Sequence, residues 1–178
     1  MSKVTAVDIK GLWYAPLSVV TGKLTASMLK SILEDSKTKQ ITNVHQDTWA
    51  IEEEDPSVTR YRNQLTNGVY RETREMGAVQ MSFTIGQYSY EEKAAFIGGE
   101  ATETSWARAR GVTNIEYCMI ALTADEQYCV FPKGAVTGRN AQADGAIGIG
   151  VAVTALEPDN AAISAEYWYS KSEVYPGA

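Results

Sequence analysis

The sequence predicts a mainly β fold: a β-sandwich or partly closed barrel of about seven strands, flanked by one or two short α-helices. In VQMSFTIG (79–86) apolar and polar side chains alternate, which is typical of a half-buried strand. In AIGIGVAVTALEPD (146–159) large apolar residues alternate with small ones, so one face of this strand is apolar and the other is almost bare. Core burial explains the apolar face and leaves the bare face unexplained.

The composition is that of one globular domain. The 178 residues are 44% hydrophobic and 21% charged, which indicates a single domain over 1–178. No apolar stretch reaches the roughly 20 residues that span a bilayer, so no membrane association is expected. A net charge of −6 disfavours binding to nucleic-acid phosphates, which needs Lys and Arg. Cys118 and Cys129 are too few for a disulfide scaffold and are expected to be reduced.

Several other segments have the composition of strands. They are the opening stretch and residues 7–15, 41–51, 114–123, 127–134 and 163–172. Thr123 to Glu126 is predicted to form the turn of a hairpin between two of them. If the loop of this hairpin holds an even number of residues, Cys118 and Cys129 lie on the same face of the sheet.

Two short helices are predicted between the strands. In TASMLKSILEDSK (25–37), Thr25 is the candidate N-cap, and Leu24 and Leu29 have the spacing of a hydrophobic staple. In the second helix, Ser89 and Glu92 have the spacing of a capping box, and Gly98 is placed to end the helix. The apolar stripes of both helices are interpreted as packing faces.

Residues 52–77 differ from the rest of the chain, because they hold ten charged residues and few apolar ones. Asn67-Gly68 predicts a two-residue hairpin turn, which would place Arg60 opposite Glu75 and Asn63 opposite Glu72. An alternative is a helix that begins at Asp55-Pro56, with Val58, Tyr61 and Leu65 spaced along it. Both alternatives predict a long, charged arm that projects from the domain.

Few residues suggest catalysis or a cofactor. His45 and Asp47 would share a face of a strand, but no nucleophile motif accompanies them. The acidic run Glu52–Asp55 lacks the spacing of a calcium loop, and Gly148-Ile149-Gly150 lacks the rest of a dinucleotide-binding fingerprint. We therefore expect no enzyme activity, no catalytic, cofactor-binding or metal-binding residues, and no cofactor.

Aromatic residues suggest an alternative function, a carbohydrate-binding β-sandwich module. Tyr167, Trp168, Tyr169 and Trp106 could stack on sugar rings. Alternation along a strand, however, places the two tyrosines on one face and Trp168 on the other. Packing in the core and at a sheet edge explains this pattern as well.

The order of these elements resembles that of bacteriophage tail tube (major tail) proteins, including the tubes of contractile injection systems. The resemblance rests on ITNVHQDTWAI, the arm at 52–77, VQMSFTIGQY followed by EEKAAFIGG, ATETSWARARG, the hairpin IEYCMIALTADEQYCVFPKG, and AIGIGVAVTALEPD. It implies a structural virion protein, assembled in the host cytoplasm, whose hexameric rings stack into a tube. It also implies that the arm reaches a neighbouring subunit or ring, that other tail proteins are contacted, and that DNA passes through an acidic lumen without specific binding.

Self-association would use the arm and the bare strand face, because small residues permit the close approach of another backbone. The residues predicted at this interface are Glu52, Glu53, Glu54, Asp55, Arg60, Arg62, Asn67, Gly68, Arg71, Arg74, Gly148, Gly150 and Ala152.

Overall fold

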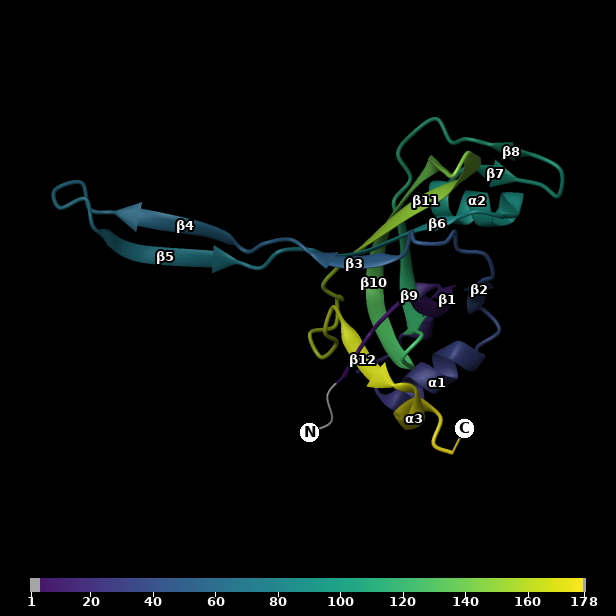
Figure 1. The fold of residues 1–178 in the computed structure, drawn as a ribbon, viewed down its shortest axis with the longest axis horizontal. Helices are drawn as coiled ribbons and strands as arrows, with labels where there is room; N and C mark the ends of the chain where they lie inside the picture. The colour runs from purple at the N-terminus through teal and green to yellow at the C-terminus, as the bar shows by residue number, and fades with distance from the viewer. Residues whose placement is uncertain (1–3, 178) are drawn as a thin grey trace.

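Strands dominate the structure, a computed structural model that describes residues 4–177. The strands are β1 (Ile9–Ala15), β2 (Lys39–Ile41), β3 (Ala50–Glu53), β4 (Ser57–Arg62), β5 (Val69–Glu75), β6 (Val79–Ile85), β7 (Glu100–Ala101), β8 (Trp106–Ala107), β9 (Ile115–Thr123), β10 (Gln127–Ala143), β11 (Ala146–Ala155) and β12 (Tyr167–Ser170). The helices are α1 (Ala26–Glu34), α2 (Tyr90–Ile97) and α3 (Lys171–Val174), with a 3-10 turn at Leu17–Val19. The predicted mainly β fold is confirmed (Figure 1).

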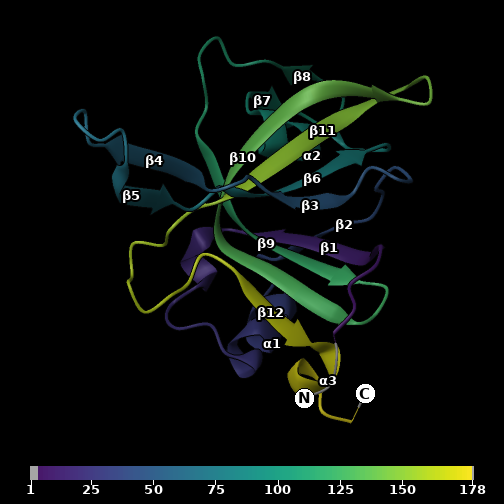
Figure 2. The same cartoon turned by 60° about the vertical axis from the view of Figure 1, so that its left-hand side comes forward.

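One antiparallel sheet of eight strands folds over on itself. Its order is β2-β1-β9-β10-β11-β6-β3, and β12 pairs with β10. The first half of β10 pairs with β9 and β12 and the second half with β11, with a register shift against β9 between Phe131 and Gly134. β11, β6 and β3 thereby come to lie opposite β9 and β1 (Figure 2). The two halves enclose the main core, in which Phe83, Phe131 and Ile149 are buried, as in a β-sandwich.

A second core covers the opposite face of β1, β9 and the first half of β10. It contains Leu29 and Ile32 of α1, Val174 of α3, and Ile120 and Val130 of the sheet. Thr25 caps α1 as predicted, because its hydroxyl accepts a hydrogen bond from the Met28 N–H at 3.2 Å. Leu24 is buried in the same cluster as Leu29, which agrees with the predicted staple.

The helix α2 follows β6 directly and packs on the main core through Phe96, which is fully buried. Its predicted capping box is confirmed. The Glu92 N–H donates to Ser89 Oγ at 3.1 Å, and the Ser89 N–H donates to the Glu92 carboxylate at 2.8 Å. Gly98 ends the helix with a φ of +83°, and an added Cβ would lie 2.8 Å from Thr113 Oγ1.

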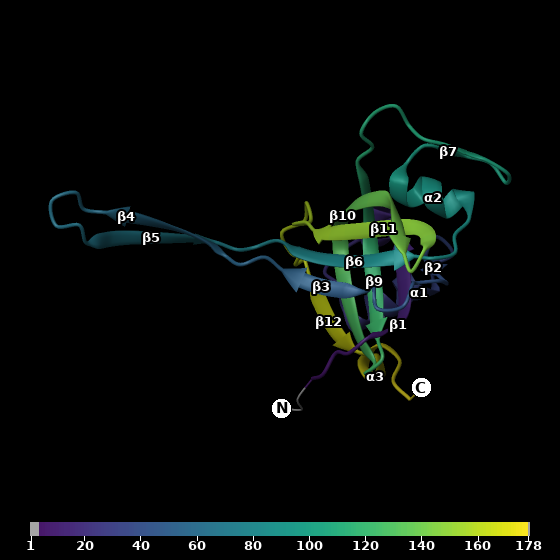
Figure 3. The ribbon, with the colours of Figure 1, turned by 45° about the horizontal axis from the view of Figure 1, so that its top comes forward.

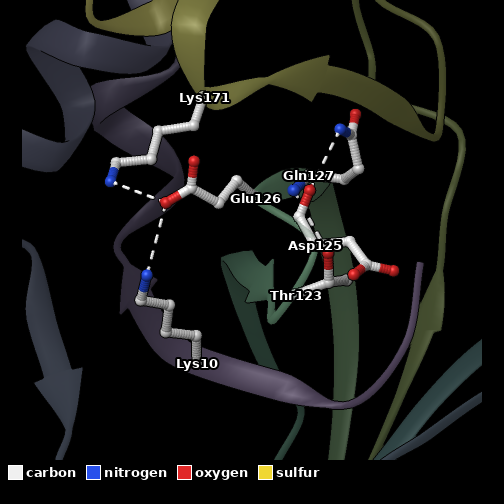
Figure 4. Close-up of polar contacts among 6 residues, drawn as sticks. All are labelled: Lys10, Thr123, Asp125, Glu126, Gln127 and Lys171. Atoms are coloured by element: carbon white, nitrogen blue, oxygen red, sulfur yellow. Dashed lines mark hydrogen bonds and ion pairs between the residues drawn. The ribbon is translucent and has the colours of Figure 1, made fainter. Parts of the chain in front are cut away.

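The predicted hairpin between β9 and β10 is confirmed, and its turn ties β1 and α3 together (Figure 4). Glu126 lies in this turn at a φ of +60°. Its carboxylate accepts hydrogen bonds from Lys171 Nζ at 3.2 Å and Lys10 Nζ at 3.3 Å. These two lysines hold the pKa of the Glu126 carboxyl below its usual value. The main-chain N–H of Lys171 also donates to the Glu126 carbonyl at 2.9 Å.

The two cysteines lie on opposite faces of the sheet. Leu122 pairs with Tyr128, so the loop holds an odd number of residues, and the condition for the same-face arrangement, an even loop, is not met. Cys118 belongs to the second core and Cys129 to the main core, and both are free thiols. Burial raises the pKa of the Cys118 thiol to about 12.

Some predicted strands differ from the observed ones. Residues 41–51 hold only the end of β2 and the start of β3, joined by an irregular segment, and the strand within 163–172 is limited to β12. Of the opening stretch, residues 4–7 form no strand, and residues 1–3 lie outside the described residues. The strand predicted at 127–134 continues to Ala143, because its second half pairs with β11.

Candidate interaction surface

The arm is a continuation of the β3–β6 hairpin and projects far from the body (Figure 1 and Figure 3). In the body Glu53 pairs with Val79, and in the arm Ser57 pairs with Glu75, so the same register runs from the body into the arm. Of the two predictions for residues 52–77, the hairpin is confirmed and the helix is wrong.

The tip of the arm closes with a longer loop than the predicted two-residue turn. The Asn63 N–H donates to the Gly68 carbonyl at 2.8 Å, and the Asn67 N–H donates to the Asn63 carbonyl at 2.7 Å. Asn67 has a φ of +57°, a conformation that Asn tolerates better than most residues. The longer loop shifts the register, so Arg60 pairs with Glu72; the predicted pairs Arg60–Glu75 and Asn63–Glu72 are wrong.

Side chains of the arm are exposed, and its charged groups interact across the two strands. Arg60 and Arg74 both bind the Glu72 carboxylate at 2.8 Å, and these hydrogen bonds lower the pKa of Glu72. Every residue of β4 is exposed, and so are the large apolar side chains of Leu65 (94%) and Met76 (89%). An isolated hairpin is only marginally stable in water. Because these side chains are exposed, the arm presents polar and apolar groups that the rest of the described chain does not bury.

The acidic run Glu52–Asp55 lies at the base of the arm. Among residues 4–177, none of these four carboxylates forms an ion pair, and no group of three His, Cys, Asp or Glu side chains could hold a metal ion. The Glu54 N–H donates to the Ala78 carbonyl at 3.0 Å. Gly77 lies so close to the facing strand that an added Cβ would be 1.7 Å from the Glu54 carbonyl oxygen.

An uncovered sheet face lies on the outer side of β3, β6, β11 and the second half of β10. Strand pairing places Ala152 between Ser82 and Thr137, and Gly150 between Thr84 and Arg139. This face holds a shallow hollow of about 330 Å³. Its side chains are small and mostly uncharged. The predicted bare face of the strand at 146–159 is thus found, and it belongs to a larger surface.

The chain's own packing requires both glycines of this strand, and Gly148, predicted at the interface, is buried. An added Cβ on Gly148 would lie 2.4 Å from the Ile85 carbonyl oxygen, and one on Gly150 would lie 2.8 Å from the Ala141 Cβ. The strands' own packing therefore accounts for both glycines, while Ala152 has no comparable explanation.

Two sheet edges border the uncovered face. β3 pairs only with β6, and among the described residues the second half of β10, from Thr137 on, pairs only with β11. This second half of β10 lies beyond the strand predicted at 127–134. Its signal in the sequence is Asp144-Gly145, a dipeptide typical of two-residue hairpin turns, with φ values of +47° and +84°.

The histidine lies apart from its predicted partner. His45 Nε2 is 2.9 Å from Asp144 Oδ2, at the tip of the β10–β11 hairpin. The predicted His45–Asp47 arrangement on one strand face is wrong, because residues 42–49 form no strand and Asp47 has a φ of +58°. The pair joins two loops that are distant in the sequence.

Three of the aromatic residues of the carbohydrate-binding alternative contact other side chains of this chain. The Trp106 ring has Lys93 Nζ at 4.7 Å and the Arg108 guanidinium at 5.5 Å from its centre. Tyr167 and Tyr169 stack on each other with ring centres 6.1 Å apart, and Trp168 lies on the other face of β12, as predicted. These contacts are typical of packing.

A scan of protein-family models finds none that matches this chain, and a search of curated proteins finds no match either. Among the described residues, no helix has both the length and the apolar character that a membrane crossing requires.

Proposed function

We propose that this protein is a structural subunit that joins copies of itself into rings, and that the rings stack into the tail tube of a bacteriophage. The observation that carries the proposal is the arm, a hairpin that projects from the body and exposes Leu65, Tyr70 and Met76. A projecting segment that exposes several large apolar side chains is typical of a site at which another protein binds. In a self-assembling subunit, the partner is a second copy.

The sheet edges support the same proposal. Unpaired strand edges promote aggregation, and closure into a ring of identical subunits removes them. β3 and the second half of β10 are the two edges that border the uncovered face. Pairing them between copies would continue the four-stranded face from one subunit to the next. Together with the arm, this surface includes the interface residues predicted from the sequence apart from Gly148, which is buried.

The uncovered face would line the lumen of such a tube. Its charged residues on the paired strands are Glu52 and Arg139, so it is nearly neutral rather than acidic as the resemblance implies. A nearly neutral face with few cations still offers DNA phosphates little to bind. The proposed role is that of a conduit in the virion tail, with no catalytic function.

Electron microscopy of the purified protein tests the proposal. We expect rings or tubes about 100 Å across, the size of a ring of six domains of this length. A variant in which residues 56–76 are replaced by a two-residue Asn-Gly turn is expected to stay folded and to lose the assemblies. Val112→Ala, which removes an exposed apolar side chain outside the arm, is the matched control. A wild-type protein that stays monomeric at every concentration contradicts the proposal.

A further inference from the structure

Charge is separated along the arm. Its base holds the four carboxylates of Glu52–Asp55, whereas residues 60–74 hold four arginines and one glutamate. This contrast occurs in a chain whose net charge is −6. The outer part of the arm is therefore a basic segment on an acidic protein.

The outer arginines are only partly neutralised. Arg60 and Arg74 share the single carboxylate of Glu72. Arg62 donates to the Asn67 carbonyl at 3.3 Å, and Arg71 lies 5.7 Å from the centre of the Tyr61 ring. Among the described residues, neither Arg62 nor Arg71 forms an ion pair with a carboxylate.

The base and the outer part of one arm are too far apart to neutralise each other. The Glu53–Val79 and Tyr61–Arg71 pairs belong to one ribbon in one register, eight residues apart along each strand. At a rise of about 3.3 Å per residue this separation is about 26 Å. Charges that far apart in water are screened, since the Debye length is about 8 Å at physiological ionic strength. The outer arginines and the acidic run are therefore both available to pair with groups of another molecule.

We propose that the arms of two copies dock head to tail, with Arg62 and Arg71 of one arm against the acidic run Glu52–Asp55 of the next copy. This inference rests on the proposed self-assembly and names the partner surface of the arm. Such a contact joins two different surfaces, so it propagates from copy to copy and closes into a ring when the rotation permits. Exposed ion pairs are individually weak and sensitive to salt, so assembly should weaken as the salt concentration rises.

Charge reversal tests the docking. The tip variant carries Arg62→Glu and Arg71→Glu, and the base variant carries Glu53→Arg and Glu54→Arg. Each variant alone places like charges in contact and is expected to lose most of the protein that wild type delivers to the pellet on ultracentrifugation. An equimolar mixture of the two is expected to recover the pellet, because the reversed tip of one matches the reversed base of the other. Glu34→Arg with Asp35→Arg, exposed residues at the end of α1, is the control and should pellet like wild type.

The outcomes separate the two proposals. If wild type forms rings and the tip variant pellets equally well, the docking is wrong while the proposed function stands. A mixture that stays soluble, although both variants melt like wild type, also overturns the docking. If wild type forms no rings, both proposals fail.

Discussion

The two halves of one ribbon, β3–β6 in the body and β4–β5 in the arm, share a register but differ in what their side chains contact. Met81 and Phe83 of β6 are buried in the main core, whereas every residue of β4 is exposed. Backbone pairing is therefore the same in both halves, and apolar burial stabilises only one. The arm therefore depends on cross-strand pairs such as Arg60–Glu72, each of which contributes little in water.

The largest expected difference between the halves is in the stability lost when an aromatic side chain is removed. Phe83→Ala removes a buried ring and is expected to lower the free energy of unfolding by about 3–5 kcal/mol. Tyr61→Ala in the arm is expected to change it by about 0.5 kcal/mol or less. Urea unfolding followed by tryptophan fluorescence measures both. Equal losses of unfolding free energy in the two variants would mean that the arm unfolds cooperatively with the core and is stabilised by it.

The joint between the halves can be broken at Gly77. Gly77→Ala places a Cβ against the Glu54 carbonyl oxygen, so the ribbon must shift, at an expected cost of about 1–3 kcal/mol. Gly111→Ala is the control, because nothing lies within 4 Å of its added Cβ. Hydrogen exchange of the Glu54 amide, which donates to Ala78, measures the opening of the joint. An unchanged exchange rate of the Glu54 amide in Gly77→Ala would show that the joint accommodates the alanine side chain.

The tip of the arm allows a local change. Asn67→Ala places alanine at a positive φ, which is expected to weaken the hairpin by about 1 kcal/mol. Because the arm packs on no core, amide exchange in β4 and β5 should quicken while the melting temperature of the body stays constant. Asn67→Gly, which tolerates this conformation, is the matched control. A lower melting temperature in Asn67→Ala would show that the two regions unfold together.

The smallest expected difference between the body and the arm is in how strongly a carboxylate of each region affects the pH dependence of the melting temperature. Glu126 in the body and Glu72 in the arm both have a pKa below the usual value, owing to Lys171 and Lys10 in one case and Arg60 and Arg74 in the other. A lowered carboxyl pKa stabilises the folded state above the unfolded value of about 4.3, and this stabilisation is lost as the pH falls through the folded value.

Replacement of each glutamate by glutamine separates the two regions. Glu126→Gln is expected to lower the melting temperature slightly at pH 7 and to reduce its further fall below about pH 4.3. Glu72→Gln should leave the melting temperature unchanged at both pH values, because Glu72 acts only within the arm. Both carboxylates are exposed, so both effects should shrink at high salt. A drop for Glu72→Gln equal to that for Glu126→Gln would contradict this assignment.

Local features of the fold could be predicted well. The capping box of Ser89 and Glu92, the Thr25 cap and the alternation along 79–86 are confirmed, because each depends on residues a few positions apart. The register of the arm could not be predicted, since Asn67-Gly68 suggests a two-residue turn while the observed loop is longer. The arm was therefore located correctly along the chain, but with the wrong partner for Arg60.

Contacts between distant segments account for the remaining differences. His45 binds Asp144 of the β10–β11 tip instead of sharing a face with Asp47. Glu126 binds Lys10 and Lys171, from near the two ends of the chain. No periodicity marks such pairs, because the segments between them form the loops and sheets that bring them together.

The mainly β composition, the two capped helices and the presence of a charged arm follow from short stretches of sequence, because hydrophobic periodicity and capping act over a few residues. Two features depend on long-range strand pairing: β10 continues to Ala143 and pairs in both halves of the sheet, and the β3–β6 register continues into the arm. The physical reason is that strand pairing joins residues far apart in the chain, and its register depends on loop lengths and packing that no short segment contains.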